Sequence, residues 1–309
     1  MIKPVAHVVH GALARGPRWL GRAYLEAISP FSRAFLSMEQ HRRVMNSLCG
    51  YGHPWPAFDF APRRVVLGRA TEVLLTPHLG EFDQQALFSR RLDYEPAVFA
   101  WLEEHAMQYD LIIEIGANVG IYSVFFDALA RRRSAGERPR LVAFEPAPQA
   151  YQRLQRNLAI NGAEVEIHQK AVGDRSGQRT FYEPRDHLTN GSLVRSAAAF
   201  HAEQVTETVV TVVAAGELER WLKPARRALL KIDVEGYEPQ LLAALGPLIE
   251  RHRPDLIVEV LPGTPEALAG NASLAGYERF LIAGDGLKKE ENFYFSREHF
   301  DWLLRWPRA

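Results

Sequence analysis

The sequence predicts an α/β fold in which helices cover both faces of a parallel sheet. Continuous apolar runs, which are typical of buried parallel strands, recur at 111–115, 141–145, 165–169, 228–233 and 255–260. Helical patterns alternate with these runs, and the first run ends in a turn that contains two glycines. In such sheets ligands bind beyond the carboxyl ends of the strands. We therefore expect the functional residues at that edge.

Residues 1–60 are predicted to be an N-terminal helical extension, rich in arginine and aromatic side chains. A cluster of prolines ends this region, at positions 54, 56 and 62. The main domain then occupies 61–309, with its core motifs within 111–262. We interpret the extension as a helical cap on the main domain; the alternatives are contact with a membrane or a partner, including a homodimer.

Composition excludes several classes of protein. The 37 basic and 37 acidic residues cancel, so no net field attracts nucleic acid. Cys49 is the single cysteine, which excludes an intramolecular disulfide, and His7 and His10 have no supporting ligands, so no metal site is assigned. No apolar run approaches the ~20 residues of a membrane span, and no signal peptide core is present. We expect a cytoplasmic protein without an integral membrane segment.

Two short elements precede the first core strand. Segments 64–68 and 72–76 have the pattern of a β-hairpin, and 95–106 that of a helix leading into the sheet. Between 179 and 213 shorter β-like pieces surround a polar loop. We interpret this region as an insertion beside the ligand site, in which Asn190–Ser192 are within reach of a substrate.

Two helices of the main domain have clear boundaries in the sequence. The first follows Pro148, places apolar residues at helical spacing and stops at Asn161-Gly162. The second follows Gly236, carries Pro239 in its first turn and ends near Gly246-Pro247. Each lies between two predicted strands, as a parallel sheet requires.

The turn after the first core strand is the most informative motif. Glu114 lies in the apolar run, and Gly116, Asn118 and Gly120 follow before the next helix. The glycines permit a sharp turn and a close approach to a ligand. The dinucleotide fingerprint G-x-G-x-x-G is absent, which argues against pyrophosphate binding. The pattern therefore favours a ligand with a nucleoside and an amino acid part over a dinucleotide.

Residues suited to a nucleoside follow two further strands. Glu145 ends the second core strand, where a carboxylate accepts hydrogen bonds from a ribose diol; the alternative is a solvated strand end. Ala171 and Val172 follow the third strand and leave room for a flat purine, although a plain turn explains them equally well.

The fourth core strand ends in a charged segment. Lys231, Asp233 and Glu235 alternate with apolar residues, so they fall on one side of the strand. Charges at the end of a buried strand are poor packing choices. The pattern is compatible with three roles: orienting a substrate hydroxyl, taking its proton or holding a divalent cation. The alternative is that Asp233 or Glu235 caps the helix that follows. Glu259 closes the fifth strand at the same edge, where a solvated end is equally compatible.

Together these segments resemble the FkbM family of S-adenosylmethionine-dependent methyltransferases. The matching segments, in this order, are 114–123, 143–146, 157–161 and 231–236, with further landmarks at 94–96 and 191–193. The resemblance covers roughly residues 90–262 and depends on the combination and order of the motifs. The sequence departs from the family pattern at two places on the substrate side. The family often has a histidine soon after the acid of the fifth strand, but none follows Glu259, and the family's Thr-Leu-Asp segment before the fourth strand is absent at 212–215.

The resemblance implies a Rossmann-like methyltransferase fold with a mostly parallel, seven-stranded sheet. Its seventh strand would be antiparallel, with 293–295 as the candidate. The resemblance also implies S-adenosylmethionine as the cofactor. Its methionine part would be surrounded by Glu114, Gly116, Asn118 and Gly120. Glu145 would hold the ribose, and Ala171 and Val172 would border the adenine. The residues implied at the reacting centre are Asp233 and Glu235.

The function predicted from these residues is O-methylation of a hydroxyl on a sugar, glycan or secondary metabolite. Asp233 or Glu235 would act as the base or orient the hydroxyl. One alternative is a non-catalytic binding module that keeps the methyltransferase fold. The other is a dinucleotide-dependent oxidoreductase, which the missing glycine fingerprint disfavours.

Overall fold

The structure is a computed structural model that describes residues 60–78, 81–185, 190–201, 204–284, 286–296 and 300–307. The chain divides into two compact units, Met1–Tyr94 and Glu95–Ala309. The predicted N-terminal extension, up to residue 59, lies outside the described residues, as do the homodimer contacts expected of it. The predicted domain boundary near residue 60 therefore stays a prediction.

The first unit contains the predicted hairpin. Strands β1 (Arg63–Leu67) and β2 (Thr71–Leu75) pair antiparallel in full register. Alternate side chains of both strands are buried, which is the pattern of a ribbon with one covered face. A 3₁₀ helix, η1 (Phe82–Leu87), follows, and His78 Nδ1 lies 2.7 Å from Asp83 Oδ2 just before it.

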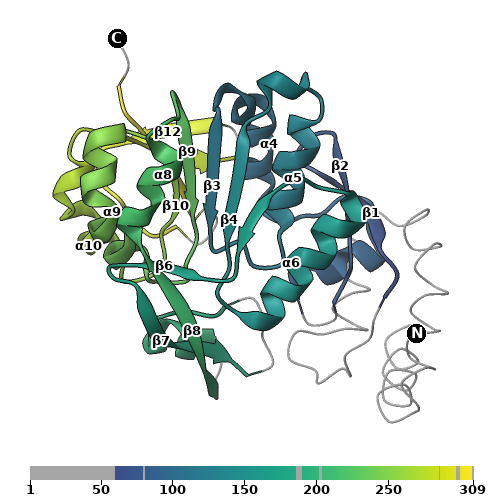
Figure 1. Cartoon of the computed structure of the whole chain (residues 1–309), viewed down its shortest axis with the longest axis horizontal. Helices are drawn as coiled ribbons and strands as arrows, with labels where there is room; N and C mark the ends of the chain where they lie inside the picture. Colours follow the sequence, from purple (N-terminus) through teal and green to yellow (C-terminus); the bar gives the residue numbers. More distant parts are fainter. Residues whose placement is uncertain are drawn as a thin grey trace, which may run out of the picture. The chain divides into compact units, whose positions relative to one another are not determined.

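The second unit is built on an eight-stranded sheet (Figure 1). The strand order is β12-β11-β13-β10-β9-β3-β4-β5. The strands are β3 (Leu111–Ile115), β4 (Arg140–Phe144), β5 (Glu166–His168), β9 (Ala228–Ile232), β10 (Asp255–Glu259), β11 (Glu278–Ala283), β12 (Gly286–Glu290) and β13 (Asp301–Arg305). The five strands from β10 to β5 through β9, β3 and β4 pair in parallel, and these are the five core strands predicted from the sequence.

Helices cover both faces of this sheet, as predicted (Figure 1). One face carries α4 (Pro96–His105), α5 (Ile121–Ala130) and α6 (Pro148–Asn161), and the other α8 (Glu219–Leu222), α9 (Glu238–His252) and α10 (Pro265–Ala269). Short 3₁₀ turns occur at η2 (Ala106–Gln108), η3 (Ala135–Glu137), η4 (Ala215–Leu218) and η5 (Ala272–Leu274). Within the described ranges, no helix combines the length and apolar character needed to cross a membrane.

The main core lies between the sheet and α9. Ile113 of β3 and Leu230 of β9 are fully buried there with Leu241 of α9. Because side chains alternate along a strand, the neighbouring Glu114 and Lys231 point to the opposite face, toward α5. The strand pattern therefore directs two charged side chains to the same face of the sheet.

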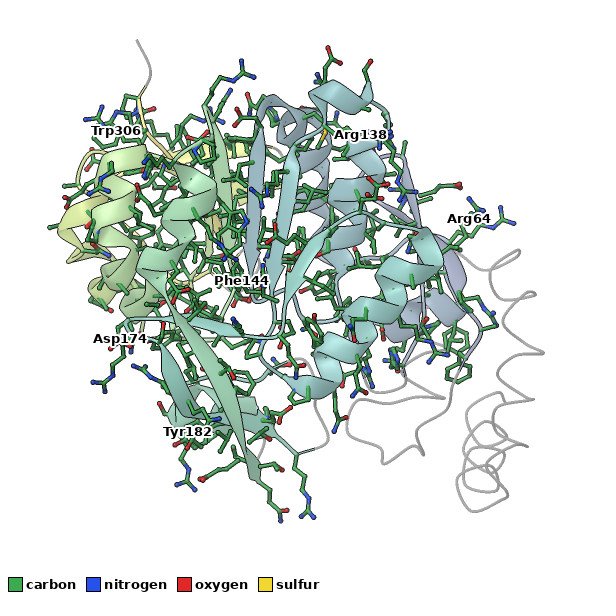
Figure 2. The ribbon with its side chains drawn as sticks, in the orientation of Figure 1. Arg64, Arg138, Phe144, Asp174, Tyr182 and Trp306 are labelled. Atoms are coloured by element: carbon green, nitrogen blue, oxygen red, sulfur yellow. The ribbon has the colours of Figure 1, made fainter. Side chains whose placement is uncertain are left out.

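A smaller sheet forms the predicted insertion. Strands β6 (Ala171–Gly173), β7 (Gly177–Pro184) and β8 (Val205–Ala214) have the order β6-β8-β7, and the short helix α7 (Arg195–His201) lies between β7 and β8 in the chain. Figure 2 labels Tyr182 on this sheet and Phe144 within the larger one. An isolated antiparallel β-bridge pairs Ser192, which follows β7 in the chain, with Tyr182 of β7.

Two predictions about the C-terminal strands are wrong. Residues 293–295 do not form the antiparallel strand; β13 does, inserted between β10 and β11. Phe293 instead packs edge-on against Trp302 of β13, with ring centroids 5.2 Å apart. The sheet also has eight strands rather than seven, because β12 pairs with the outer edge of β11.

The predicted end of the helix after Gly236 is also wrong. The helix α9 does not stop at Gly246-Pro247 but continues to His252, with the proline inside it. Leu248 and Ile249 lie beyond the proline and are buried in the main core. Their burial stabilises a turn of helix that local sequence preference disfavours.

Candidate functional site

The ends of β3, β4 and β9 are joined by hydrogen bonds between their backbones. Gly116 and Ala117 donate their N–H groups to the Phe144 carbonyl at 3.0 and 2.9 Å. Asp233 donates its N–H to the Ile115 carbonyl at 3.0 Å. The three loops that carry most of the predicted site residues therefore lie together at one edge of the sheet.

The two glycines of the first loop are required by packing within the protein. Gly116 has φ +90°, and a Cβ there would lie 1.6 Å from the Asp233 carbonyl oxygen. Gly120 has φ +82°, and its Cβ would lie 2.3 Å from Leu154 Cδ1. The expected sharp turn is present. Protein atoms occupy the space nearest each missing Cβ, which is a packing reason for glycine at both positions, and the close approach to a ligand stays a prediction.

Glu114 is buried and faces α5. Its Oε2 accepts a hydrogen bond of 2.5 Å from Ser123 Oγ. Burial raises the pKa of Glu114 to about 8, and the Ser123 hydrogen bond and the charge of Lys231 limit the rise. This carboxyl group therefore holds its proton around neutral pH and serves as a link between β3 and α5 in the structure.

Glu145 organises the turn that was predicted to hold the amino acid part of the ligand. Its Oε2 accepts the Asn118 N–H at 2.7 Å, and its Oε1 accepts the Ala147 N–H at 2.8 Å. Asn118 has φ +51°, a left-handed conformation that asparagine tolerates. Burial raises the pKa of Glu145 to about 7, against the lowering effect of the two backbone hydrogen bonds. Each carboxylate oxygen keeps a lone pair for a further donor.

Small apolar residues surround the base of the insertion. Ala171 packs with Ala147 and Ala150, which begin α6, and with Phe181 of β7. Val172 is also buried, but its side chain belongs to the main core. Only Ala171 therefore lies in the same cluster as the residues that follow Glu145, and the adenine contact of Ala171 and Val172 stays a prediction.

Lys231 is a buried cation at the same edge. Its Nζ donates to Asp233 Oδ2 at 3.0 Å and lies 4.3 Å from the centre of the Tyr122 ring. Burial alone would lower the pKa of Lys231, but the charges of Asp233, Glu95 and Asp301 raise it above its usual value. Lys231 is therefore positively charged at all physiological pH values and holds the Asp233 carboxylate in place.

Three carboxylates converge beside Lys231. Asp233, Glu235 and Glu259 each place a carboxylate oxygen within 4.8 Å of the other two. Burial, together with the charge of Asp233, raises the pKa values of Glu235 and Glu259 well above their usual range. Glu235 also has φ +53°, an unfavourable backbone conformation that functional sites tend to retain. The sequence predicted the first two carboxylates and left Glu259 open.

Four further residues support this cluster and were not predicted as site residues. Tyr122 donates its hydroxyl hydrogen to Glu95, which precedes α4. Glu238 Oε1 accepts the N–H groups of Val234 at 2.9 Å and Gly236 at 3.2 Å, which shapes the loop after β9. Asp301 lies opposite Glu259 in the pairing of β10 with β13. Two of them carried a signal in the family resemblance, because Glu95 lies in the landmark at 94–96 and Tyr122 in the matching segment 114–123.

The insertion approaches the carboxylate cluster through Ser192. This side chain is buried, and its hydroxyl lies 3.5 Å from the Val234 carbonyl oxygen. The Val194 N–H donates to the same hydroxyl at 3.0 Å. Ser192 therefore lies beside the segment that follows β9, and the contact of residues 190–192 with a substrate stays a prediction.

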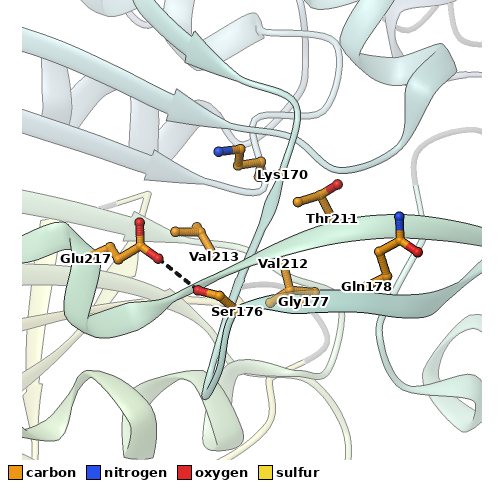
Figure 3. Close-up of a pocket in the computed structure, with 8 residues that line it drawn as sticks. All are labelled: Lys170, Ser176, Gly177, Gln178, Thr211, Val212, Val213 and Glu217. Atoms are coloured by element: carbon orange, nitrogen blue, oxygen red, sulfur yellow. Dashed lines mark hydrogen bonds between the residues drawn. The ribbon is translucent and has the colours of Figure 1, made fainter.

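A separate hollow of about 370 Å³ lies on the smaller sheet (Figure 3). It is lined by Lys170, Ser176, Gly177, Gln178, Thr211, Val212, Val213 and Glu217. Ser176 donates to Glu217 there at 2.8 Å. None of the predicted site residues lines this hollow, so it is distinct from the carboxylate cluster.

Comparison with known proteins identifies one family. Residues 114–280 match the methyltransferase FkbM domain. This match includes the loops after β3, β4 and β9 and extends into β11. No curated protein matches the chain.

The chain also resembles solved structures of methyltransferases at low sequence identity. For the methyltransferase FkbM from Methylobacillus flagellatus KT, the identity is 15% and the TM-score 0.38, over 63% of this chain and 43% of that one. For an S-adenosylmethionine-dependent methyltransferase from Agrobacterium tumefaciens, the identity is 11% and the TM-score 0.40, over 82% of this chain and 72% of that one. For the T. thermophilus 16S rRNA N2 G1207 methyltransferase, the identity is 11% and the TM-score 0.40, over 95% of this chain and 71% of that one.

Proposed function

This chain belongs to the FkbM methyltransferase family, and we propose that it uses S-adenosylmethionine to methylate a hydroxyl group of a sugar, glycan or secondary metabolite. The observation that supports O-methylation is the juxtaposition of Asp233 and Glu235 at the edge of the sheet, beside the loop organised by Glu145. An acceptor hydroxyl must lose a proton, and a carboxylate positioned beside it is suited to accept that proton.

The residues around Glu145 fit the proposed cofactor. The buried carboxylate already accepts two backbone N–H groups and keeps lone pairs for the two hydroxyls of a ribose. The alanines at 147, 150 and 171 belong to one buried apolar cluster, and Ala147 follows Glu145 by two positions. When bound, the cofactor supplies a methyl group activated by a sulfonium.

The chain's own residues would then bind and orient the acceptor. Asp233 or Glu235 accepts the hydroxyl proton, and Lys231 keeps the Asp233 carboxylate in one position through its 3.0 Å hydrogen bond. Holding both reactants in a reactive geometry contributes much of the acceleration in such two-substrate reactions. The acceptor is proposed to be a small molecule or carbohydrate rather than nucleic acid, in keeping with the absence of net charge.

Substitution of Asp233 tests the proposed function. We expect Asp233→Asn to lower kcat by about 10²–10⁴-fold, the usual contribution of a positioned acid or base. Binding of S-adenosylhomocysteine, measured by calorimetry, should change by less than about threefold, because the ribose contacts are untouched. Transfer is measured with radiolabelled methyl groups and a panel of sugars and polyhydroxylated metabolites.

Glu266→Gln is the matched control, since this glutamate is exposed on α10 and is not one of the proposed site residues. It should keep full activity. Retained turnover in both Asp233→Ala and Glu235→Ala would contradict the proposed chemistry. Failure of the folded wild type to bind S-adenosylhomocysteine would instead favour a binding module without catalysis.

The pKa of Glu145 predicts a pH dependence of cofactor binding. Ribose hydroxyls donate to the ionised carboxylate, so the affinity rises with pH as Glu145 loses its proton near pH 7. The ionised fraction increases from about one-tenth at pH 6 to about nine-tenths at pH 8. We expect S-adenosylhomocysteine to bind about tenfold more tightly at pH 8 than at pH 6. Calorimetry at both pH values measures this ratio.

Glu145→Gln should bind more weakly and with little change between the two pH values, because the titrating group is gone. Glu266→Gln should reproduce the dependence of the wild type. If the wild type binds equally well at pH 6 and pH 8, or if Glu145→Gln keeps the tenfold ratio, Glu145 does not bind the ribose in its ionised form.

A further inference from the structure

We propose that Asp233, Glu235 and Glu259 form a binding site for one hard divalent cation, Mg²⁺ or Mn²⁺. The proposal deepens the proposed function and rests on it for the role of the cation, which would polarise the acceptor hydroxyl. The sequence alone offered cation binding as one of three uses of the charged segment after β9. The structure adds the third carboxylate and the geometry.

The three ligands come from different segments that meet at one point. Asp233 and Glu235 follow β9, and Glu259 ends the neighbouring parallel strand β10. All three carboxylate oxygens lie within 4.8 Å of one another. A Mg²⁺ ion with oxygen ligands at about 2.1 Å separates adjacent ligands by about 3 Å and opposite ones by about 4.2 Å. Small rotations of the side chains therefore suffice to close the site around an ion.

An independent observation is the buried oxygen of Glu259. Its Oε2 atom is inaccessible to solvent and accepts no hydrogen bond from the described residues. A buried carboxylate oxygen without a donor is costly, and such groups in native proteins indicate a missing partner such as an ion. Since Glu259 belongs to the cluster formed with Asp233 and Glu235, a cation at their centre would supply that partner.

The charge of the site also requires a partner beyond Lys231. This lysine donates to Asp233 and is shared electrostatically with Glu95 and Asp301. A single positive charge therefore faces several buried carboxyl groups.

The donor set selects the kind of ion. All three ligands are carboxylate oxygens, which suit Mg²⁺ and Mn²⁺, whereas Zn²⁺ and Cu²⁺ favour nitrogen and sulfur. Mg²⁺ is commonly held by only a few carboxylates and keeps open positions for water or substrate. These positions would receive the oxygen of the acceptor and lower the pKa of its hydroxyl group.

Direct binding of Mn²⁺ tests the proposal without reference to activity. Metal-free protein is titrated with Mn²⁺ and the free ion is measured by electron paramagnetic resonance. We expect one site per chain, displaced by excess Mg²⁺. Glu259→Gln and, separately, Glu235→Gln should each weaken Mn²⁺ binding by at least about tenfold. The Glu266→Gln control should bind as the wild type does.

Binding of S-adenosylhomocysteine by the same variants verifies that they are folded. Absence of a stoichiometric Mn²⁺ site, or unchanged affinity in both folded variants, would overturn the proposed cation site. Methyl transfer that persists at full rate with EDTA would overturn the role of the cation and leave the proposed function standing. Mn²⁺ binding by a wild type that methylates no acceptor would support the site and contradict the proposed function.

Discussion

Replacing Lys231 with methionine is expected to lower the free energy of unfolding by about 3–5 kcal/mol. Lys231 is 2% exposed and is hydrogen-bonded to Asp233. Methionine fills a similar volume but leaves the carboxylates of Asp233 and its neighbours without their buried cation, and breaking one side of a buried ion pair has this cost. Urea denaturation in the absence of ligands and metal ions measures the change.

Two further variants separate charge from packing. The double variant Lys231→Met with Asp233→Asn should regain part of the lost stability, because it removes a charge that the single variant leaves unpaired. Lys289→Met removes an exposed lysine that pairs with Glu278 at 2.5 Å, and should cost less than about 1 kcal/mol. A Lys231→Met protein as stable as the wild type would contradict the buried ion pair.

Gly116→Ala is expected to destabilise the protein by at least about 4 kcal/mol, which is a large part of the stability of a typical domain. Two effects add at this position. The left-handed φ of +90° disfavours any side chain, and the new Cβ would lie 1.6 Å from the Asp233 carbonyl oxygen. That oxygen belongs to backbone, so relief requires the loops after β3 and β9 to separate. Thermal and urea unfolding measure the loss.

Gly263→Ala is the matched control for the backbone effect. Gly263 has φ +85°, close to that of Gly116, but a Cβ there meets no atom within 4 Å. Its substitution should cost only about 1–2 kcal/mol, the penalty of the left-handed conformation. Equal losses in the two variants would show that the contact with Asp233 is unimportant. A larger loss in Gly116→Ala assigns the excess to that contact.

Local patterns were sufficient to predict the central strands of the fold. The run at 111–115 is buried at every position and forms β3 at the residues predicted. Long-range packing decided the details that local patterns missed. The strand β13 has four successive buried residues, from Asp301 to Leu304, because it lies between two other strands. Its short apolar run gives no local sign of that position.

The candidate site was predictable where its residues follow strands along the chain. Glu145 and Asp233 both come directly after core strands, so the topology of a parallel sheet brings their loops together. Asp301 could not be predicted, since it approaches Glu259 only through the pairing of β10 with β13. Tyr122 lies in the matching segment 114–123 but was not predicted as a site residue, because one aromatic residue on an apolar helix has the same pattern whether it packs in a core or covers a lysine.

The backbone bonds that join the loops at Gly116, Phe144 and Asp233 have a consequence for divergence within the family. Peptide groups make these bonds, Gly116 leaves the room they need, and the Glu145 carboxylate adds one side-chain link to the Asn118 N–H. The side chain at position 233 can therefore be exchanged without removing the N–H group that joins its loop to β3. Evolution can alter the chemistry or the accepted substrate on this edge while the positions from which the side chains project are inherited unchanged.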